Sequence, residues 1–192
     1  MGQYRCTATI HEEGSPGAVM RPTARPGDIR IRGIRPDDWR RLQRFHDRLS
    51  PSTVSLRFHG GKKHLSEPLA RRFADLDGVH EVALVATTGS WGRIVGVARY
   101  SRVSEDAAEV AFVVEDAYQH HHLGLHLMER LKALACAKGI HTFIADVTPT
   151  NLPMLRLLEA AGPTEFQHDA VGTRVTVDLD PGRISSNGAS VP

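Results

Sequence analysis

The stretch from Ala108 to Ile140 constrains the fold of this chain more than any other feature. It opens with a mostly apolar run, passes through a polar turn at Gln119–Gly124, and continues into a row of leucines spaced four and three residues apart. The run predicts a strand over Ala108–Val114, and the leucine spacing predicts a helix from Leu123 to Lys138. The leucines of this stripe are Leu123, Leu127, Leu131 and Leu134. A strand that leads directly into a long amphipathic helix indicates a layered α/β domain.

Upstream of this unit, the sequence predicts three strands and two helices. The strands are expected at Ile29–Ile31, Glu81–Thr87 and Arg93–Val103, and short turns predict antiparallel pairing from Glu81 to Val114. A first helix should start at Pro36 and end at Ser50-Pro51, with Trp39, Leu42, Phe45 and Leu49 on its apolar side. A second should run from Ser66 to Asp77-Gly78, with Leu69, Phe73 and Leu76 on one face.

Downstream, the pattern predicts a strand, a helix and a closing hairpin. Their expected bounds are Thr142–Val147, Asn151–Ala160, Thr164–Gln167 and Arg174–Leu179. The full order is β-α-α-β-β-β-α-β-α-β-β, which mixes a meander with crossovers. It predicts an α/β domain whose mixed, mostly antiparallel sheet of six to seven strands is flanked by about four helices.

Composition restricts the domain organisation and the class of protein. The Gly- and Pro-rich residues 1–27 predict a flexible leader and residues 180–192 a flexible tail, around one domain at 28–179. A net charge of +2, from 24 basic and 22 acidic residues, does not suit a general nucleic-acid binder. The sequence shows no signal peptide and no run of about 18 apolar residues, so we expect a cytoplasmic protein that does not enter a membrane. Cys6 and Cys136 form no CxxC pair, which excludes a zinc ribbon or a redox dithiol.

Three segments resemble the GNAT superfamily of N-acetyltransferases. The first, AEVAFVVEDAYQHHHLGLHLMERLKALACAKGI (108–140), is similar to its strand, Gln/Arg-x-x-Gly-x-Gly/Ala turn and long helix. The second, NLPMLRLLEAAG (151–162), is similar to its Asn-led helix. The third, RLSPSTVSLRFHGGKKHLSEPLARRFADLDGVHEVALVA (48–86), resembles the bacterial protein-lysine acetyltransferase branch in particular. The resemblance implies the GNAT fold, with acetyl-CoA as cosubstrate and an amine as acceptor.

The resemblance also implies a set of cofactor-binding residues. A turn that enters a helix presents free N–H groups and the positive end of the helix dipole, which suits a pyrophosphate. In this chain that turn and the first helical residues are Gln119, His120, His121, His122, Leu123 and Gly124. The backbone of Phe112, Val113 and Val114, on a strand that parts from its neighbour, would meet the pantetheine arm and the oxyanion. Asn151 would contact the pantetheine arm or the sulfur, cap the last helix, or do both.

The turn departs from the family pattern, and this leaves two functions open. His122 stands where the family has its central glycine, and a Cβ there hinders both positive φ and close approach to a phosphate. Protonated imidazoles could instead add charge-assisted contacts to the pyrophosphate. In addition, Leu158 stands where many members carry a tyrosine that acts as the acid for the leaving thiolate, and Gly162-Pro163 replaces a glycine–aromatic pair. The alternatives are an active enzyme and a catalytically weakened acyl-CoA sensor or regulatory module.

Glu109 is the candidate general base. It occupies the strand position at which lysine-modifying members of the family carry a catalytic glutamate, ten residues before Gln119. A lysine amine with a pKa near 10.4 needs such a base or a water relay at neutral pH. A central strand would also desolvate this carboxyl and strengthen it as a base, unless Glu109 faces solvent. The expected acceptor is a protein lysine or a small amine, and a homodimer is possible.

Two groups of basic residues have a functional explanation and a purely structural one. His122 and His126 have the i, i+4 spacing of a metal pair, but no acidic or cysteine residue is identified as a third ligand nearby, so no metal is expected. Arg57 and the pair Lys62-Lys63 either guide an acidic partner or the cofactor's 3′-phosphate, or form a solvated basic patch.

Overall fold

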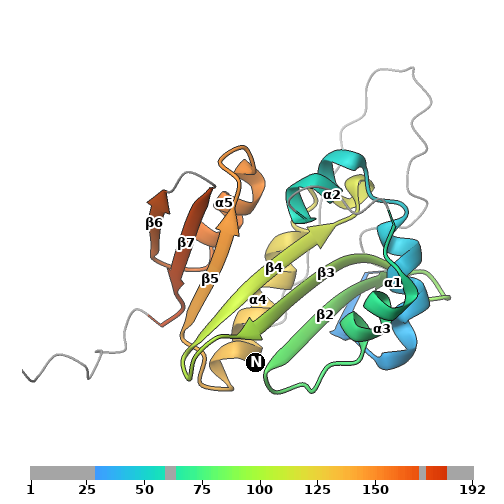
Figure 1. Ribbon diagram of the computed structural model, residues 1–192, viewed down its shortest axis with the longest axis horizontal. Helices are drawn as coiled ribbons and strands as arrows, with labels where there is room; N and C mark the ends of the chain where they lie inside the picture. Colours follow the sequence, from blue (N-terminus) through green and yellow to red (C-terminus); the bar gives the residue numbers. More distant parts are fainter. Residues whose placement is uncertain (1–28, 59–63, 169–171, 181–192) are drawn as a thin grey trace, which may run out of the picture.

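The computed structural model describes residues 29–58, 64–168 and 172–180. The predicted leader, nearly all of the predicted tail, and Lys62-Lys63 lie outside these residues. The described chain forms one seven-stranded sheet with the strand order β1-β2-β3-β4-β5-β7-β6 (Figure 1). Its strands are β1 (Arg30–Gly33), β2 (Glu81–Thr88), β3 (Arg93–Arg102), β4 (Ala107–Val114), β5 (Thr142–Val147), β6 (Thr164–His168) and β7 (Thr173–Asp178). Only the β4–β5 pair is parallel, so the expected mixed, mostly antiparallel sheet is confirmed.

The described chain contains five α-helices, one more than the sequence predicted. They are α1 (Trp39–His46), α2 (Pro51–Phe58), α3 (Glu67–Ala74), α4 (Leu123–Cys136) and α5 (Leu152–Glu159), with short 3₁₀ turns η2 (Pro36–Asp38) and η3 (Asp116–Tyr118). The prediction missed α2 because it took Ser50-Pro51 only as the end of the preceding helix. Proline cannot continue a helix, but its fixed φ and missing N–H suit the first position of a new one.

Three leucines assigned to helical stripes lie elsewhere. Leu49 and Leu76 come after the last residues of α1 and α3, although Leu49 is still buried. Leu134 is 37% exposed at the edge of α4, and Ala135 occupies the buried position instead. The helices α1 and α3 therefore end earlier than the apolar residues of the sequence suggested, because the chain turns while it continues to cover the core.

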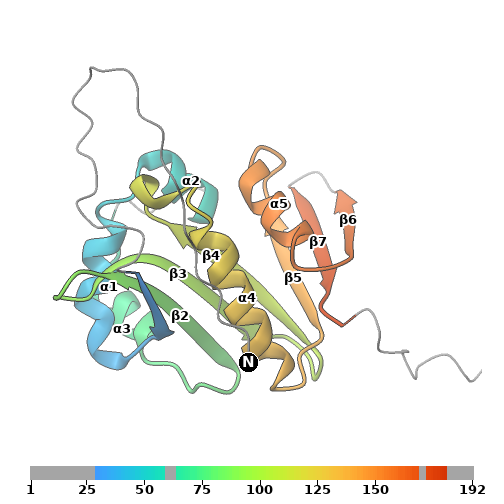
Figure 2. The same ribbon diagram turned by 180° about the vertical axis from the view of Figure 1, so that it is seen from behind.

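The helices cover the two faces of the sheet and define two cores. α1, α2 and α3 lie over one face, where Phe45 and Val54 pack against Val85 and Val97. α4 and α5 lie over the other face (Figures 1 and 2), where the buried side of α4 packs against a larger cluster centred on Tyr100. No helix in the described part of the chain has the length and apolar character needed to cross a membrane.

The parallel neighbours β4 and β5 separate soon after they meet. Their pairing covers only Ala107–Thr142, Ala108–Phe143 and Glu109–Ile144. Beyond Glu109, β4 remains paired with β3 as far as Val114, and β5 remains paired with β7 as far as Val147. The sheet is therefore open between the two strands, and Glu109 is the last β4 residue before the opening.

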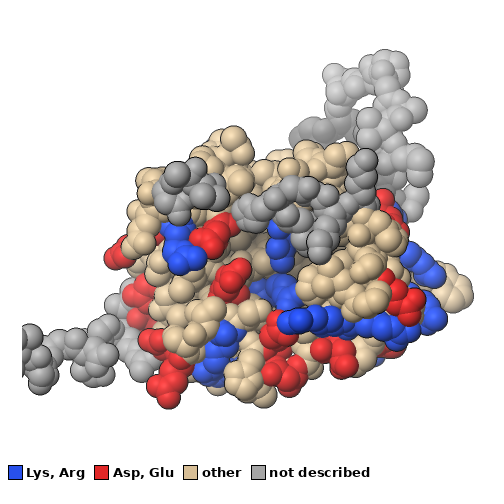
Figure 3. Space-filling model, in the orientation of Figure 1, with Lys and Arg blue, Asp and Glu red and all other residues tan. Residues whose placement is uncertain are grey.

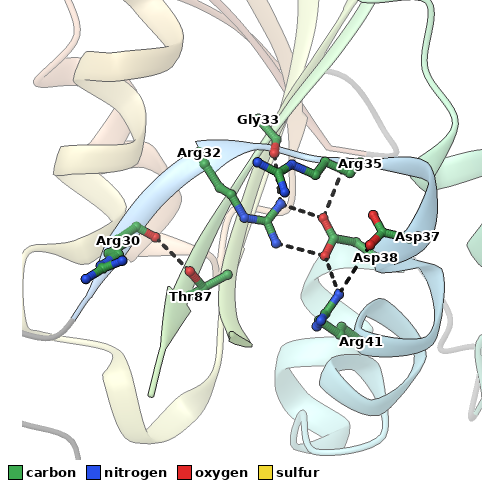
Figure 4. Close-up of polar contacts among 8 residues, drawn as sticks. All are labelled: Arg30, Arg32, Gly33, Arg35, Asp37, Asp38, Arg41 and Thr87. Atoms are coloured by element: carbon green, nitrogen blue, oxygen red, sulfur yellow. Dashed lines mark hydrogen bonds and ion pairs between the residues drawn. The ribbon is translucent and has the colours of Figure 1, made fainter. Parts of the chain in front are cut away.

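A buried carboxylate ties β1 to the start of α1 (Figure 4). The Asp38 side chain is fully buried, and Arg32 contacts its two oxygens at 2.6 and 2.8 Å. The backbone N–H of Arg35 donates a hydrogen bond to Asp38 Oδ2 at 3.0 Å, and Arg41 Nη1 donates one to Asp38 Oδ1 at 3.1 Å. Burial alone would raise the pKa of Asp38, but these hydrogen bonds and the charges of Arg32 and Arg41 outweigh it and hold the pKa below its ordinary value.

We predict that Asp38→Asn lowers the free energy of unfolding by roughly 2–4 kcal/mol, because it leaves buried donors facing a neutral amide. The control Asp37→Asn removes the neighbouring carboxylate, whose side chain is 75% exposed and lies 3.9 Å from Arg41. It should cost less than about 0.5 kcal/mol. Urea denaturation at pH 7 measures both, and equal losses would contradict this account.

The lowered pKa of Asp38 also predicts a pH dependence with a definite sign. The folded state favours the ionised carboxylate, so this stability is fully present above the unfolded pKa of about 3.9 and is lost as the pH falls through the folded value. Acidification from pH 5 to pH 3 should therefore destabilise the wild type more than Asp38→Asn, as measured by urea denaturation across that range.

Candidate active site

The turn between η3 and α4 adopts the conformation that glycine usually supplies. His120 and His122 have φ values of 64° and 58°, whereas His121 between them keeps a negative φ. His122, with ψ near 8°, is the N-cap of α4 in the left-handed region. All three imidazoles are exposed. The histidines therefore do not prevent the left-handed turn, although a Cβ in this region costs about 1–2 kcal/mol per residue.

The N-terminus of α4 presents free backbone amides. No side chain among the described residues caps it, and the first bond into the helix runs from His126 N–H to the carbonyl of His122 at 3.1 Å. The N–H groups of Leu123, Gly124 and Leu125 thus have no acceptor in the described part of the chain. Such amides, at the positive end of a 14-residue helix, can bind an anion such as a pyrophosphate.

Phe112, Val113 and Val114 line the β4 side of the opening. They are half-buried and lie beyond the last β4–β5 pair, so their edge facing β5 has no neighbouring strand. The Val114 carbonyl accepts a hydrogen bond from Gln119 Nε2 at 3.0 Å. The side chain of Gln119 thus holds the end of the strand, while its predicted contact with the cofactor remains a proposal.

Asn151 stands on the β5 side of the opening. Its Oδ1 accepts a hydrogen bond from the N–H of Met154 at 3.3 Å, which makes it the N-cap of α5. The capping role is therefore confirmed. Its side-chain NH₂ group has no partner among the residues described, so the predicted contact with the pantetheine arm is compatible with the cap.

Two acidic residues that the sequence analysis missed fix the corner between β4 and the turn. Glu115 is buried and forms ion pairs with Arg93 and, at 3.1 Å, with Arg48. Asp116 accepts hydrogen bonds from the hydroxyls of Ser50 at 2.6 Å and Thr53 at 2.8 Å. These contacts join residues more than 60 positions apart, except for Arg93, and no local pattern could have indicated them.

Hydrogen bonds from Ser50, just before α2, and Thr53, in its first turn, hold the pKa of Asp116 below its ordinary value. Burial by itself acts in the opposite direction, but the hydroxyl and backbone N–H of Ser50 and the hydroxyl of Thr53 outweigh it. Thr53 Oγ1 also accepts from Gln119 Nε2 at 3.3 Å. The first turn of α2 is therefore connected through hydrogen bonds to the turn that precedes α4.

The side chain of Glu109 lies on the face of the sheet opposite α4. Its side chain is exposed, so the expectation that a central strand would desolvate it is wrong. The alternation of β4 directs Ala108 and Val110 into the α4 core and leaves Glu109 on the face that carries α2 and α3. There it borders a cleft of about 290 Å³.

The cleft beside Glu109 has both polar and apolar walls. Its polar lining consists of Arg57, Arg72, Arg99, Glu81, Ser101 and Glu109. Figure 3 shows this face of the molecule, with a hollow near its centre that contains basic side chains. Burial, and to a smaller extent the charge of Arg99, lower the pKa of Arg57 to about 10, while the charge of Glu109 opposes this shift. Arg57 is thus part of a partly buried cleft and does not belong to a solvated patch.

Comparison with known proteins identifies the family. The pattern described as the acetyltransferase (GNAT) family matches residues 42–162. The chain belongs to the GNAT acetyltransferase family. It is an acyl-CoA-dependent N-acetyltransferase by that membership, and the parted strands and uncapped α4 fit this assignment.

Individual relatives support the same family. The chain is 32% identical over 137 residues to "Acetyltransferase PA5475" of Pseudomonas aeruginosa, covering 70% of this chain and 74% of that protein. It is 29% identical over 153 residues to "Acetyltransferase Pat" of Mycolicibacterium smegmatis, covering 79% of this chain but only 46% of that protein. The crystal structure of the GNAT domain of S. lividans PAT is 33% identical, with a TM-score of 0.73 and coverage of 79% of this chain and 90% of that one. The resemblance to the protein-lysine acetyltransferase branch is thereby confirmed.

Packing determines two positions of this GNAT domain, Leu158 in α5 and Gly162 in the loop after it. Leu158 is fully buried in the larger core, so its position supplies no acid for a leaving thiolate. A Cβ on Gly162 would lie 2.0 Å from the carbonyl oxygen of Asp178, which only glycine avoids. This close approach brings the end of α5 onto β7.

The histidines of this GNAT domain form no metal site in the described residues. No three His, Cys, Asp or Glu side chains are grouped there closely enough to hold an ion. His126 lies 3.7 Å from Glu129, one turn along α4.

The left-handed turn predicts opposite effects of glycine at adjacent histidines. His122→Gly should raise the free energy of unfolding by about 0.5–1 kcal/mol, because relief of strain exceeds the added entropy of the unfolded chain. The matched control His121→Gly relieves no strain and should lower it by about 0.5–1 kcal/mol. Urea denaturation tests the pair; a loss of stability in both variants would show that His122 is not strained.

Proposed function

We propose that this GNAT domain transfers an acetyl group from acetyl-CoA directly to a primary amine, with protein lysine as the acceptor and Glu109 as general base. The observation that carries the proposal is the opening between β4 and β5. It is bordered by the free amides of α4 on one side and by Asn151 on the other, and Glu109 stands where it begins. The relatives named Pat and PAT support protein lysine over small amines.

The proposed reaction requires two proton transfers and one exchange of bonds. A lysine with a pKa near 10.4 arrives as an ammonium ion, and Glu109 accepts a proton from it, directly or through one water. The neutral nitrogen forms a bond to the thioester carbonyl carbon, and the carbon–sulfur bond breaks to release the CoA thiolate. The thiolate takes up the second proton of the nitrogen, directly or through water, which leaves a neutral amide and free CoA. Backbone donors at the edge of β4 would stabilise the oxyanion formed in between.

Seating of the cofactor would use three groups in this chain. The amides of Leu123, Gly124 and Leu125 would hold the pyrophosphate at the positive end of α4. The exposed imidazoles of His120–His122 would add charge-assisted hydrogen bonds when protonated. Phe112–Val114 and the amide of Asn151 would hold the pantetheine arm. The left-handed geometry of the turn supports this proposal, because it keeps the helix amides open.

A second candidate is a module that binds acyl-CoA without turnover. It is favoured by the burial of Leu158, which leaves α5 without an acid, and by the imidazoles around the pyrophosphate turn. The two candidates share the cofactor site and differ only in chemistry.

Binding and turnover can be measured separately. We expect calorimetry to show one site for acetyl-CoA, and a thiol-release assay with lysine peptides to show CoA formation above the uncatalysed rate. At a hundred times the Kd, acetyl-CoA should stabilise the fold by about 2.7 kcal/mol. Binding without thiol release would establish the sensor. The absence of both binding and thiol release would contradict both candidates.

The base is tested by substitution of the carboxylate. Glu109→Gln should lower kcat by about 10²–10⁴-fold, because general-base catalysis contributes that range, and should leave the Kd for acetyl-CoA unchanged. The loss should diminish above pH 9 as the amine loses its proton unaided. Glu105→Gln is the control, since this exposed carboxylate lies in the loop before β4. Full activity in Glu109→Gln would overturn the assignment.

A further inference from the structure

The cleft beside Glu109 carries more positive than negative charge. Three guanidinium groups and two carboxylates line it. One carboxylate is already engaged, because Glu81 Oε1 accepts from Arg99 Nη2 at 2.9 Å and from Ser101 Oγ at 3.2 Å. Glu109 thus shares the cleft with two further arginines, Arg57 and Arg72.

The three arginines come from different elements and all line the cleft. Arg57 stands in the last turn of α2, Arg72 in α3 and Arg99 in β3. Arg99 is 14% exposed and lies over the Phe73 ring at 4.8 Å. Its charge lowers the pKa of Arg57, and Arg72 contributes to the lowered pKa of Arg99, so the three cations act on one another. Arg72 is exposed and has no ion pair with the residues described.

This charge distribution restricts the acceptors that can enter. A lysine side chain arrives as a cation, and like charges in a partly desolvated cleft disfavour it. An acceptor that carries a carboxylate close to its amine replaces this repulsion with attraction. Guanidinium groups suit that carboxylate because their planar donors can bind both of its oxygens.

We propose that the cleft selects lysines with an adjacent acidic residue, whose carboxylate binds Arg57 and Arg72 while the amine faces Glu109. The inference rests on the proposed function, because it names the acceptor class of that same site. A free amino acid has the same chemistry, an amine beside a carboxylate. We assign the protein source because the acceptor cleft is open on the surface in Figure 3.

The test compares acceptors that differ only in one charge. Lysine peptides with Glu or Gln next to the lysine are assayed for thiol release with acetyl-CoA, and free amino acids are assayed beside their amides. We expect kcat/KM to be at least about ten-fold higher for the Glu peptide, the lower end for a charge-assisted hydrogen bond. The difference should lie in the KM for the peptide. A ratio near one overturns the proposal, and discrimination confined to free amino acids replaces the protein source with a small molecule.

Variants then locate the discrimination. Arg72→Gln, at an exposed position, and Arg57→Gln should each bring the Glu-to-Gln ratio towards one, with the KM for acetyl-CoA unchanged. Arg130→Gln removes an equal charge from the exposed side of α4, on the other face of the sheet, and should keep the ratio. A ratio that persists in both Arg57 and Arg72 variants overturns the assignment to this cleft.

A binding measurement separates this inference from the proposed activity. Acetylated product peptides, with Glu or Gln beside the acetyl-lysine, are titrated into the protein in the presence of CoA. Ten-fold tighter binding of the Glu peptide, lost in Arg72→Gln, supports the acceptor site even if thiol release is absent and the enzymatic proposal fails. Equal binding, or no binding of either peptide, overturns the inference while leaving an active enzyme possible.

Discussion

The separation of β4 from β5 is the constraint on which the rest of the structure depends. Backbone N–H and C=O groups in a sheet normally find partners on the next strand, and leaving them without partners away from water is costly. Here the parallel pairing ends at Glu109–Ile144, while each strand continues along its other neighbour. The open edges are therefore maintained by the outer contacts of the two strands, and a ligand with amide groups of its own can fill them.

Polar contacts far apart in sequence hold this opening. Glu115, directly after β4, is drawn towards β3 and the end of α1 by Arg93 and Arg48. Asp116 is held by Ser50 and Thr53 at the start of α2. β5 is instead held by six residue pairs to β7, where Gly162 permits the close approach of the preceding loop. The two sides of the opening thus belong to two separately anchored parts of one sheet.

Periodic patterns predicted the elements, but they did not predict what covers them. The strand Thr142–Val147 was placed at its observed bounds, and the other six predicted strands differ from the observed ones only at their ends. This agreement arises because alternation is a local property of the sequence. α2 was missed because Pro51 fits both a helix end and a helix start. The exposure of Glu109 depends on how α2 and α3 pack, and the anchoring roles of Glu115 and Asp116 depend on partners from another part of the chain. Such non-local contacts leave no local signal in a single sequence.

The proposed cofactor and acceptor sites of the domain are connected through one short hydrogen-bonded path. α2 contributes Arg57 to the acceptor cleft at its last turn and Thr53 at its first, where the Thr53 hydroxyl contacts both Asp116 and Gln119. Gln119 in turn holds the Val114 carbonyl at the edge of the opening. A helix of eight residues is short enough to move as a unit, so a displacement of its acceptor end would also act on the pyrophosphate turn. In the proposed reaction, Asp116, which holds the start of α2, would therefore help to fix the relative position of amine and thioester, which is the geometric requirement of direct transfer.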